Sequence, residues 1–105
     1  MTLLLAPTCA VRVPPANGPY SLLAEEELDV WITRLVDAAC YTIPANETGL
    51  PAINIPAGLD SEGLPIGVQF YGNFIGEDLL LRLAAQLEQA RPEWFGAQPG
   101  VHVAA

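Results

Sequence analysis

The segment Thr42–Tyr71 limits the possible folds of this chain more than any other part of its sequence. Within it, Ala52–Pro56 and Ile66–Tyr71 carry large apolar side chains at every second position, which is the period of a pleated strand. The polar run Asp60–Glu62 lies between them, and neighbouring glycines supply the backbone freedom of a turn. Prolines mark the expected strand ends, where a missing amide donor costs little: Pro56 and Pro65. The simplest prediction is a β-hairpin.

The N-terminal segment Thr2–Ala6 is a continuous apolar run, which favours a strand covered on both faces in the sheet of an α/β protein. Such a strand needs helices above and below it and a neighbour on each edge. The rest of the chain offers two convincing helices and two other strands, so we expect some partners of this strand to lie outside the sequence. Pro7–Pro19, which is rich in proline, is expected to form a surface loop.

The first predicted helix opens at Glu25–Glu27, whose carboxylates suit the positive end of a helix dipole. Its apolar residues recur at helical spacing and are expected to pack inward: Leu28, Trp31, Ile32, Leu35 and Ala39. Pro44 is expected to end this helix or its frayed last turn. After it, Asn46 and Gly49 are predicted at tight backbone positions, the glycine because it tolerates a positive φ.

The second predicted helix opens at Gly76–Asp78 and is stopped by Pro92. Residues 93–105 combine glycine and proline breaks with the only histidine, and we expect an irregular tail. No linker divides the sequence, so residues 1–105 are predicted to be a single domain or a part of one.

Composition narrows the classes of partner. The net charge of −8 and the pI of about 4.2 argue against nucleic acids and anionic membrane surfaces, which need clustered lysine and arginine. The apolar runs are far shorter than the roughly 20 residues that cross a bilayer, and no signal-like segment begins the chain. We therefore expect a cytoplasmic protein that contacts neither nucleic acid nor membrane.

A further set of residues has an order that is hard to obtain by chance. It comprises Asn46–Ala52, Pro56–Gly58, Gly63–Gln69, Gly72, Glu77 and Leu79–Leu80. In this order the chain resembles the C-terminal region of the amidase signature hydrolases, and the similarity extends from Leu3 to about Ala90. The resemblance implies a fragment of a mixed-sheet α/β/α fold with a β-hairpin and two main helices. It also implies hydrolysis of a carboxamide by a Ser-Ser-Lys triad, whose nucleophile lies in a Gly/Ser-rich stretch earlier in the chain.

That triad has no counterpart in this sequence. The chain contains no lysine, and its cations are all arginines: Arg12, Arg34, Arg82 and Arg91. Its serines, Ser21 and Ser61, lie outside any glycine-rich stretch, and no Gly-Gly or Ser-Ser pair occurs. We therefore assign no catalytic residue, and we expect the isolated chain to be inactive.

Other chemistry receives little support from the sequence. A Cys/His nucleophile pair would need Cys9 or Cys40 within hydrogen-bond reach of His102, but both cysteines have apolar neighbours and are expected to be buried as small hydrophobes. Two cysteines in a chain without an export signal do not form a disulfide framework. A structural zinc site needs about four ligands at characteristic spacing, and no phosphate-binding glycine motif occurs. We expect no metal and no cofactor.

Two functional hypotheses remain. The chain is the C-terminal part of an amidase, active only with the N-terminal segment that carries the triad. Alternatively, it is a non-catalytic α/β module that binds a partner or associates with itself through exposed apolar surfaces. The substrate in the first case would be a small amide.

Overall fold

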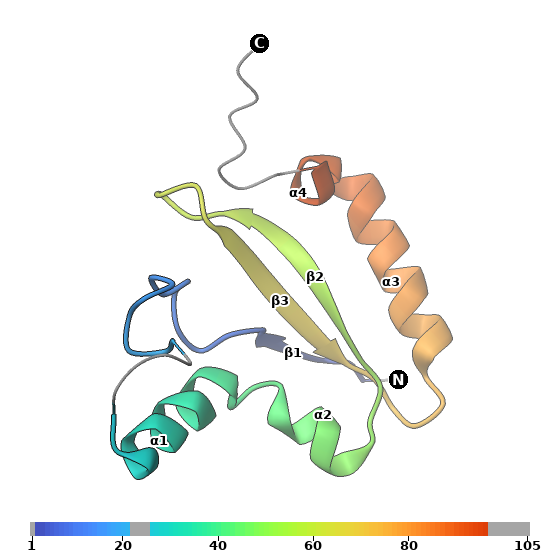
Figure 1. Cartoon of the computed structure of the whole chain (residues 1–105). Coiled ribbons are helices and arrows are strands. Elements are labelled where there is room, and N and C mark those ends of the chain that lie inside the picture. Colours follow the sequence, from blue (N-terminus) through green and yellow to red (C-terminus); the bar gives the residue numbers. More distant parts are fainter. Residues whose placement is uncertain (1, 22–25, 97–105) are drawn as a thin grey trace.

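The computed structural model describes residues 2–21 and 26–96, which form one antiparallel sheet and four helices (Figure 1). The strands are β1 (Leu4–Pro7), β2 (Ala52–Leu59) and β3 (Pro65–Tyr71), in the order β1-β3-β2. The helices are α1 (Leu28–Ala39), α2 (Ile43–Thr48), α3 (Glu77–Ala90) and α4 (Pro92–Gly96). This combination agrees with the α/β class, although the described strands pair only in antiparallel fashion.

The β2–β3 hairpin confirms the prediction from alternating apolar residues. Ile53 pairs with Phe70 and Ile55 pairs with Val68, so these four side chains share one face of the sheet. The prediction that Pro56 ends the first strand was wrong, because β2 continues beyond it with a register shift. A proline is tolerated there because β2 is an edge strand with a local irregularity.

Strand β1 lies at the opposite edge of the sheet. It pairs only with β3 in the described sheet, and its leucines are open to solvent, with Leu4 63% and Leu5 60% exposed. The expectation of a strand covered on both faces is therefore not met within the described residues. The free edge and the exposed side chains are the places that the expected outside partners would occupy.

The well-packed part of the molecule is the side of the sheet where α3 and α4 contact β2 (Figure 1). Ile55 on β2 and Leu80 on α3 are almost completely buried. Trp94 on α4 also contacts β2: a Cβ atom at Gly58 would meet its ring at 3.5 Å. Burying these apolar side chains against one another holds the two helices to the hairpin.

Helix α1 is shorter than expected at both ends, and its apolar stripe does not pack inward. It begins at Leu28, with Asp29 as the acid of its first turn, and it ends at Ala39. Leu28, Ile32 and Leu35 remain exposed, the last at 49%. No described element covers these residues, so the helix forms but the predicted burial of its stripe does not occur.

Pro44 was predicted to end the first helix, but it lies in the first turn of α2. Proline fits there because amides of the first helical turn have no partner within the helix. Asn46 is helical rather than a tight turn residue, whereas Gly49 has φ +72° and ends α2 as expected. The segment that was predicted as one helix ending at Pro44 therefore contains two helices, α1 and α2, separated by a turn.

Helix α3 matches the prediction, with Glu77 and Asp78 in its first turn. The tail prediction was wrong for residues 93–96, which belong to α4. Pro92 both ends α3 and opens α4, and the guanidinium of Arg91 lies 4.8 Å from the centre of the Trp94 ring. Residues 97–105, including His102, lie outside the described part of the chain.

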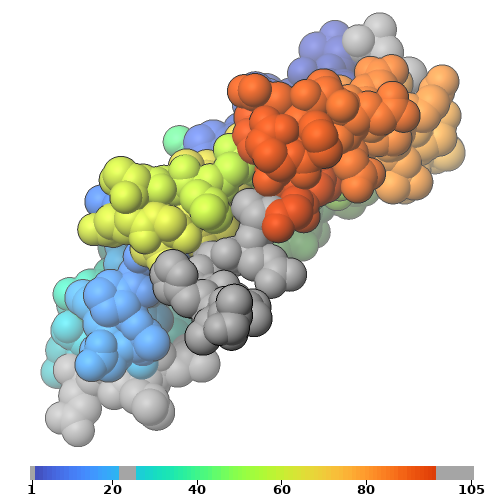
Figure 2. Space-filling view, turned by 90° about the horizontal axis from the view of Figure 1, so that it is seen from above, coloured from blue at the N-terminus to red at the C-terminus, as the bar shows by residue number. Residues whose placement is uncertain are grey.

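The molecule is thin, and its smallest extent is 17 Å. Seen from above, it is an elongated body with α3 and α4 toward one end and the loop before α1 toward the other (Figure 2). A body of this thickness has few positions that are shielded on all sides. This explains why Ile55, Tyr71 and Leu80 are the only large hydrophobic residues that are buried among those described.

The packing of α3 on the sheet can be tested with two adjacent leucines. Leu80 is 3% exposed and Leu81 is 63% exposed on the same helix. We expect Leu80→Ala to lower the free energy of unfolding by about 2–5 kcal/mol, because it leaves a cavity, and Leu81→Ala to change it by less than about 0.5 kcal/mol. Urea denaturation followed by circular dichroism measures both. Equal losses would show that α3 does not pack as described.

Candidate functional site

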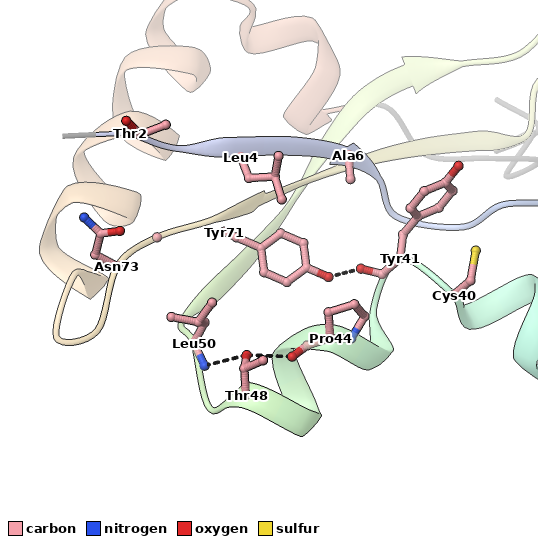
Figure 3. Close-up of a pocket in the computed structure, with 11 residues that line it drawn as sticks. Thr2, Leu4, Ala6, Cys40, Tyr41, Pro44, Thr48, Leu50, Tyr71 and Asn73 are labelled. Carbon is pink, nitrogen blue, oxygen red and sulfur yellow. Dashed lines mark hydrogen bonds between the residues drawn. The ribbon is translucent and has the colours of Figure 1, made fainter.

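A cleft of about 380 Å³ lies between the sheet and α2 (Figure 3). Strands β1 and β3 form one wall, and α2 with the residues on either side of it forms the other. The cleft is lined by Thr2, Leu4, Ala6, Cys40, Tyr41, Pro44, Thr48, Leu50, Tyr71, Gly72 and Asn73. Most of its surface is apolar, so it suits an apolar group rather than a charged one.

One backbone carbonyl joins the two walls of this cleft. The hydroxyl of Tyr71 and the side-chain amide of Gln69 both donate hydrogen bonds to the carbonyl oxygen of Tyr41, the amide over 2.6 Å. Gln69 is only 5% exposed, and its pairing removes the penalty of a buried unpaired amide. Gln69 therefore bonds to buried backbone and does not face water.

The far wall is fixed by local hydrogen bonds at the end of α2 (Figure 3). The Thr48 hydroxyl donates to the carbonyl of Pro44 over 2.6 Å, and it accepts from the amide of Leu50 over 3.3 Å. The amide of Gly49 donates to the carbonyl of Ala45 over 2.9 Å, with the glycine in the left-handed conformation. These bonds turn the chain sharply from α2 into β2, so the opening of the cleft is set by backbone geometry.

A second polar contact lies further along the same face of the sheet. The Thr8 hydroxyl donates to the side-chain oxygen of Asn54, and the Thr8 amide donates to the carbonyl of Gly67 over 3.2 Å. Asn54 is the cross-strand partner of Gln69. A Cβ atom on Gly67 would lie 2.9 Å from both side-chain oxygens, so a larger residue there would have to displace this contact.

The hairpin turn carries the strongest electrostatic arrangement among the described residues. One carboxylate oxygen of Asp60 accepts from the amides of Glu62 and Leu64 over 2.8 and 3.0 Å, and the other accepts from the Arg12 guanidinium over 3.0 Å. Donation from the Leu64 amide and then from Arg12 lowers the pKa of Asp60. Arg12 also pairs with Glu62 over 2.8 Å, so its charge holds the proline-rich loop against the turn.

The serines and the cysteines considered for chemistry in the sequence do not meet at one site in the cleft. Ser21 and Ser61 do not line the cleft. Cys9 and Cys40 are exposed free thiols, so the expectation that they are buried was wrong. Both lie in or beside turns at the surface, where apolar sequence neighbours do not enforce burial. His102 is outside the described residues.

The lining of the cleft is poor in ionisable side chains. Of the described residues that line it, none is a carboxylate, an imidazole or a lysine that could act as a general base. No group of three or more potential metal ligands occurs in the described ranges 2–21 and 26–96. The cleft can therefore hold a group in place, but it does not supply acid–base chemistry.

The cleft was not predicted from the sequence. A signal was present, because Gln69 and Tyr71 are two residues apart in a predicted strand and must share a face. What the sequence did not reveal is that a single carbonyl, that of Tyr41, accepts from both side chains.

Comparison with known proteins places this arrangement in a family. The family model described as Amidase matches residues 2–81, which is most of the described chain. The chain belongs to the amidase family. The hairpin, the Gly49 turn, the cleft and the start of α3 all fall within the matched region. None of the described helices is long and apolar enough to span a membrane.

Curated amidase relatives are similar over most of this chain but are much longer. A glutamyl-tRNA(Gln) amidotransferase subunit from Synechococcus sp. (strain CC9311) is 54% identical over 87 residues, which is 83% of this chain and 16% of the relative. The 6-aminohexanoate-cyclic-dimer hydrolases of Pseudomonas sp. (strain NK87) and Paenarthrobacter ureafaciens are 41% and 40% identical over 101 residues, 92% of this chain and 20% of each relative. The chain thus spans less than a quarter of the length of these relatives. No solved structure matches it.

The contribution of the shared Tyr41 carbonyl can be measured with two tyrosine variants. Tyr71→Phe removes one of its donors, whereas Tyr41→Phe changes the side chain and leaves the carbonyl in place. We expect Tyr71→Phe to lower the free energy of unfolding by about 1 kcal/mol, the usual net value of a hydrogen bond. It should also speed hydrogen exchange in α2, since Gln69 alone then holds that wall. Tyr41→Phe should do neither, and similar effects from both variants would contradict the role of the carbonyl.

The hairpin turn should respond to pH in a defined direction. Because the folded pKa of Asp60 is lowered, its contribution to stability is present above its unfolded pKa of about 3.9 and is lost as pH falls through the folded value. Asp60→Asn keeps an oxygen for the two amides but loses the charge that binds Arg12. We expect wild type to exceed Asp60→Asn in stability near pH 6, and the gap to narrow below about pH 4.

Thermal denaturation across that pH range measures the gap. Glu47→Gln is the matched control, because Glu47 is an exposed carboxylate on α2 with no ion pair among the described residues. Its difference from wild type should not depend on pH in this way. A constant gap for Asp60→Asn would show that the ionised carboxylate does not stabilise the turn.

Proposed function

We propose that this chain is the C-terminal part of an amidase that cleaves the C–N bond of a carboxamide by a Ser-Ser-Lys mechanism. The nucleophile and its base belong to an N-terminal segment with a Gly/Ser-rich stretch. Attack of the serine on the carbonyl breaks the C–N bond, releases the amine or ammonia and leaves an acyl-enzyme, which water then hydrolyses to release the carboxylate. Membership of the amidase family supports the reaction class. The relatives whose names are hydrolase and amidotransferase are several times longer than this chain, which leaves room for the segment that carries the triad.

The observation that carries this proposal is the apolar surface left open on β1 and α1. The chain is 51% hydrophobic, yet large side chains on these two elements are exposed: Leu4, Leu5, Leu28, Ile32, Leu35 and Val36. An exposed patch of this kind marks a surface that another segment covers. If a few hundred Å² are uncovered, about 25 cal/mol per Å² amounts to roughly 5–10 kcal/mol, which is comparable to the stability of a whole domain.

The placement of helices on both sides of the sheet also supports the proposal that the chain is part of an amidase. Helices α3 and α4 lie on one side of the sheet, and α2 is held to the opposite side through the Tyr41 carbonyl. A sheet between two helical layers is the α/β/α arrangement implied by the resemblance, and the free edge of β1 is where a wider sheet would continue. In this proposal the present chain is scaffold, with no catalytic residue, no cofactor and no metal, and the complete protein is cytoplasmic.

The alternative is a non-catalytic α/β module, which binds a partner or a second copy of itself through the same surface. The apolar cleft favours binding as a function in its own right, because it exists without any residue from an upstream segment. The two proposals differ in what covers β1 and α1, and therefore in whether an N-terminal amidase segment restores hydrolysis.

Reconstitution separates the proposals. We expect the isolated chain to release no ammonia from simple primary amides, and co-expression with an N-terminal amidase segment that carries the triad to give hydrolysis. Leu35→Glu should reduce the reconstituted rate at least about tenfold, because it places a charge in the covered surface. Gln86→Glu adds the same charge at an exposed polar position of α3 and should leave the rate unchanged. Turnover by the isolated chain that depends on one of its own residues would overturn the proposal.

The open surface should also be visible without an assay of activity. We expect the isolated chain to enhance the fluorescence of a hydrophobic dye strongly, and Leu35→Glu to weaken that signal by reducing the apolar surface. Assembly with the N-terminal segment should suppress most of it. A compact monomer that does not bind the dye would contradict the presence of an uncovered surface.

A further inference from the structure

The two segments that carry the cysteines are joined directly by a backbone hydrogen bond. The amide of Ala10 donates to the carbonyl of Ala38 over 3.2 Å. This carbonyl is in the last turn of α1, where carbonyls have no partner within the helix. Cys9 immediately precedes Ala10, and Cys40 follows Ala38 by two residues, so the bond brings both thiols to one small region of the surface.

Both cysteines are also flanked by residues anchored to the same strand. The side chain of Thr8, just before Cys9, lies over Gly67, where a Cβ atom would meet its hydroxyl at 2.9 Å. The carbonyl of Tyr41, just after Cys40, accepts from the side chain of Gln69. Positions 67 and 69 are two residues apart on β3 and therefore lie on the same face. The positions of the two cysteines are thus set by the sheet, at neighbouring points of one strand.

The thiols themselves are available for reaction. Both are exposed and free, although they are far apart in sequence. Figure 3 shows the sulfur of Cys40 directed toward the chain that leaves β1, which is the segment that contains Cys9. We propose that Cys9 and Cys40 form a reversible dithiol–disulfide pair that is oxidised by low-molecular-weight disulfides of the glutathione class.

The reaction balances as two thiol–disulfide exchanges. The thiolate of one cysteine attacks a sulfur of the small disulfide, whose S–S bond breaks and releases one small thiol. The thiolate of the other cysteine then attacks the protein sulfur of this mixed disulfide and displaces the second small thiol. Two protein thiols are oxidised, and one small disulfide is reduced to two thiols.

The product would connect the end of α1 to the segment after β1. Cys40 lines the cleft, so the bond would fix one rim of the cleft to the sheet. The exchange reaction does not involve amide hydrolysis. The Cys9–Cys40 pair also differs from the disulfide framework of a secreted protein, because it is a single exposed pair that small thiols can reduce.

The experiment treats the 105-residue chain with oxidised and reduced glutathione at low protein concentration. Mass spectrometry of wild type should show the loss of two hydrogen atoms and a Cys9–Cys40 linked peptide, reversed by excess reduced glutathione. Cys9→Ser and Cys40→Ser remove the resolving thiol, so each should instead accumulate one bound glutathione. Oxidised wild type should melt higher than the reduced form, by on the order of 10 °C, and neither single variant should show this shift.

The proposal would be overturned if wild type carried two glutathiones, as the sum of the single variants predicts. Disulfide-linked dimers in place of the internal link would also overturn it, since they would show that the two thiols of one chain do not meet. Neither single substitution removes the Thr8 or the Tyr41 contact, so both variants are expected to fold like wild type. Circular dichroism of the reduced proteins checks that the variants fold like wild type.

Discussion

The carbonyl oxygen of Tyr41 is the contact on which the second layer of this structure depends. On one side of the sheet, α3 and α4 are held by buried apolar side chains, chiefly Ile55 and Leu80. On the other side, α2 has no fully buried residue of its own. Its position depends on hydrogen bonds from Gln69 and Tyr71 to the turn before it. Polar bonds of this kind are directional, so they place a helix more precisely than apolar burial alone.

This division between an apolar and a polar side comes from β3, the central strand of the described sheet. Val68 and Phe70 point to one face, and Gln69 and Tyr71 point to the other. One strand therefore joins two layers through two kinds of interaction. A shift of its register by one residue would exchange them, leaving Gln69 among apolar side chains and Val68 beside the Tyr41 carbonyl.

The sequence predicted those elements whose local signals agree with one another. The hairpin followed from alternation, α3 from the acids at its start and the proline after its end, and the Gly49 turn from the conformational freedom of glycine. Prolines were misjudged because a proline can begin a helix as well as end one: Pro44 lies in the first turn of α2, and Pro92 follows α3 and opens α4. The sequence around a proline does not show whether the proline ends a helix or begins one. Tertiary contacts, such as that of Trp94 with β2, decide this.

The exposure of the α1 stripe and of β1 could not be read from the sequence for a different reason. Periodicity reports which side chains share a face, and it does not report whether that face meets another element in the same chain. On the side of α3 the partner is present and Leu80 is buried, whereas on the side of α1 Leu35 is left open. If the proposed function is right, the contrast locates the surface that the N-terminal segment would cover at α1 and β1, next to the cleft. A segment bound there would lie against the cleft wall built from Tyr41 and Tyr71, which is where residues from outside this chain could meet a group held in the cleft.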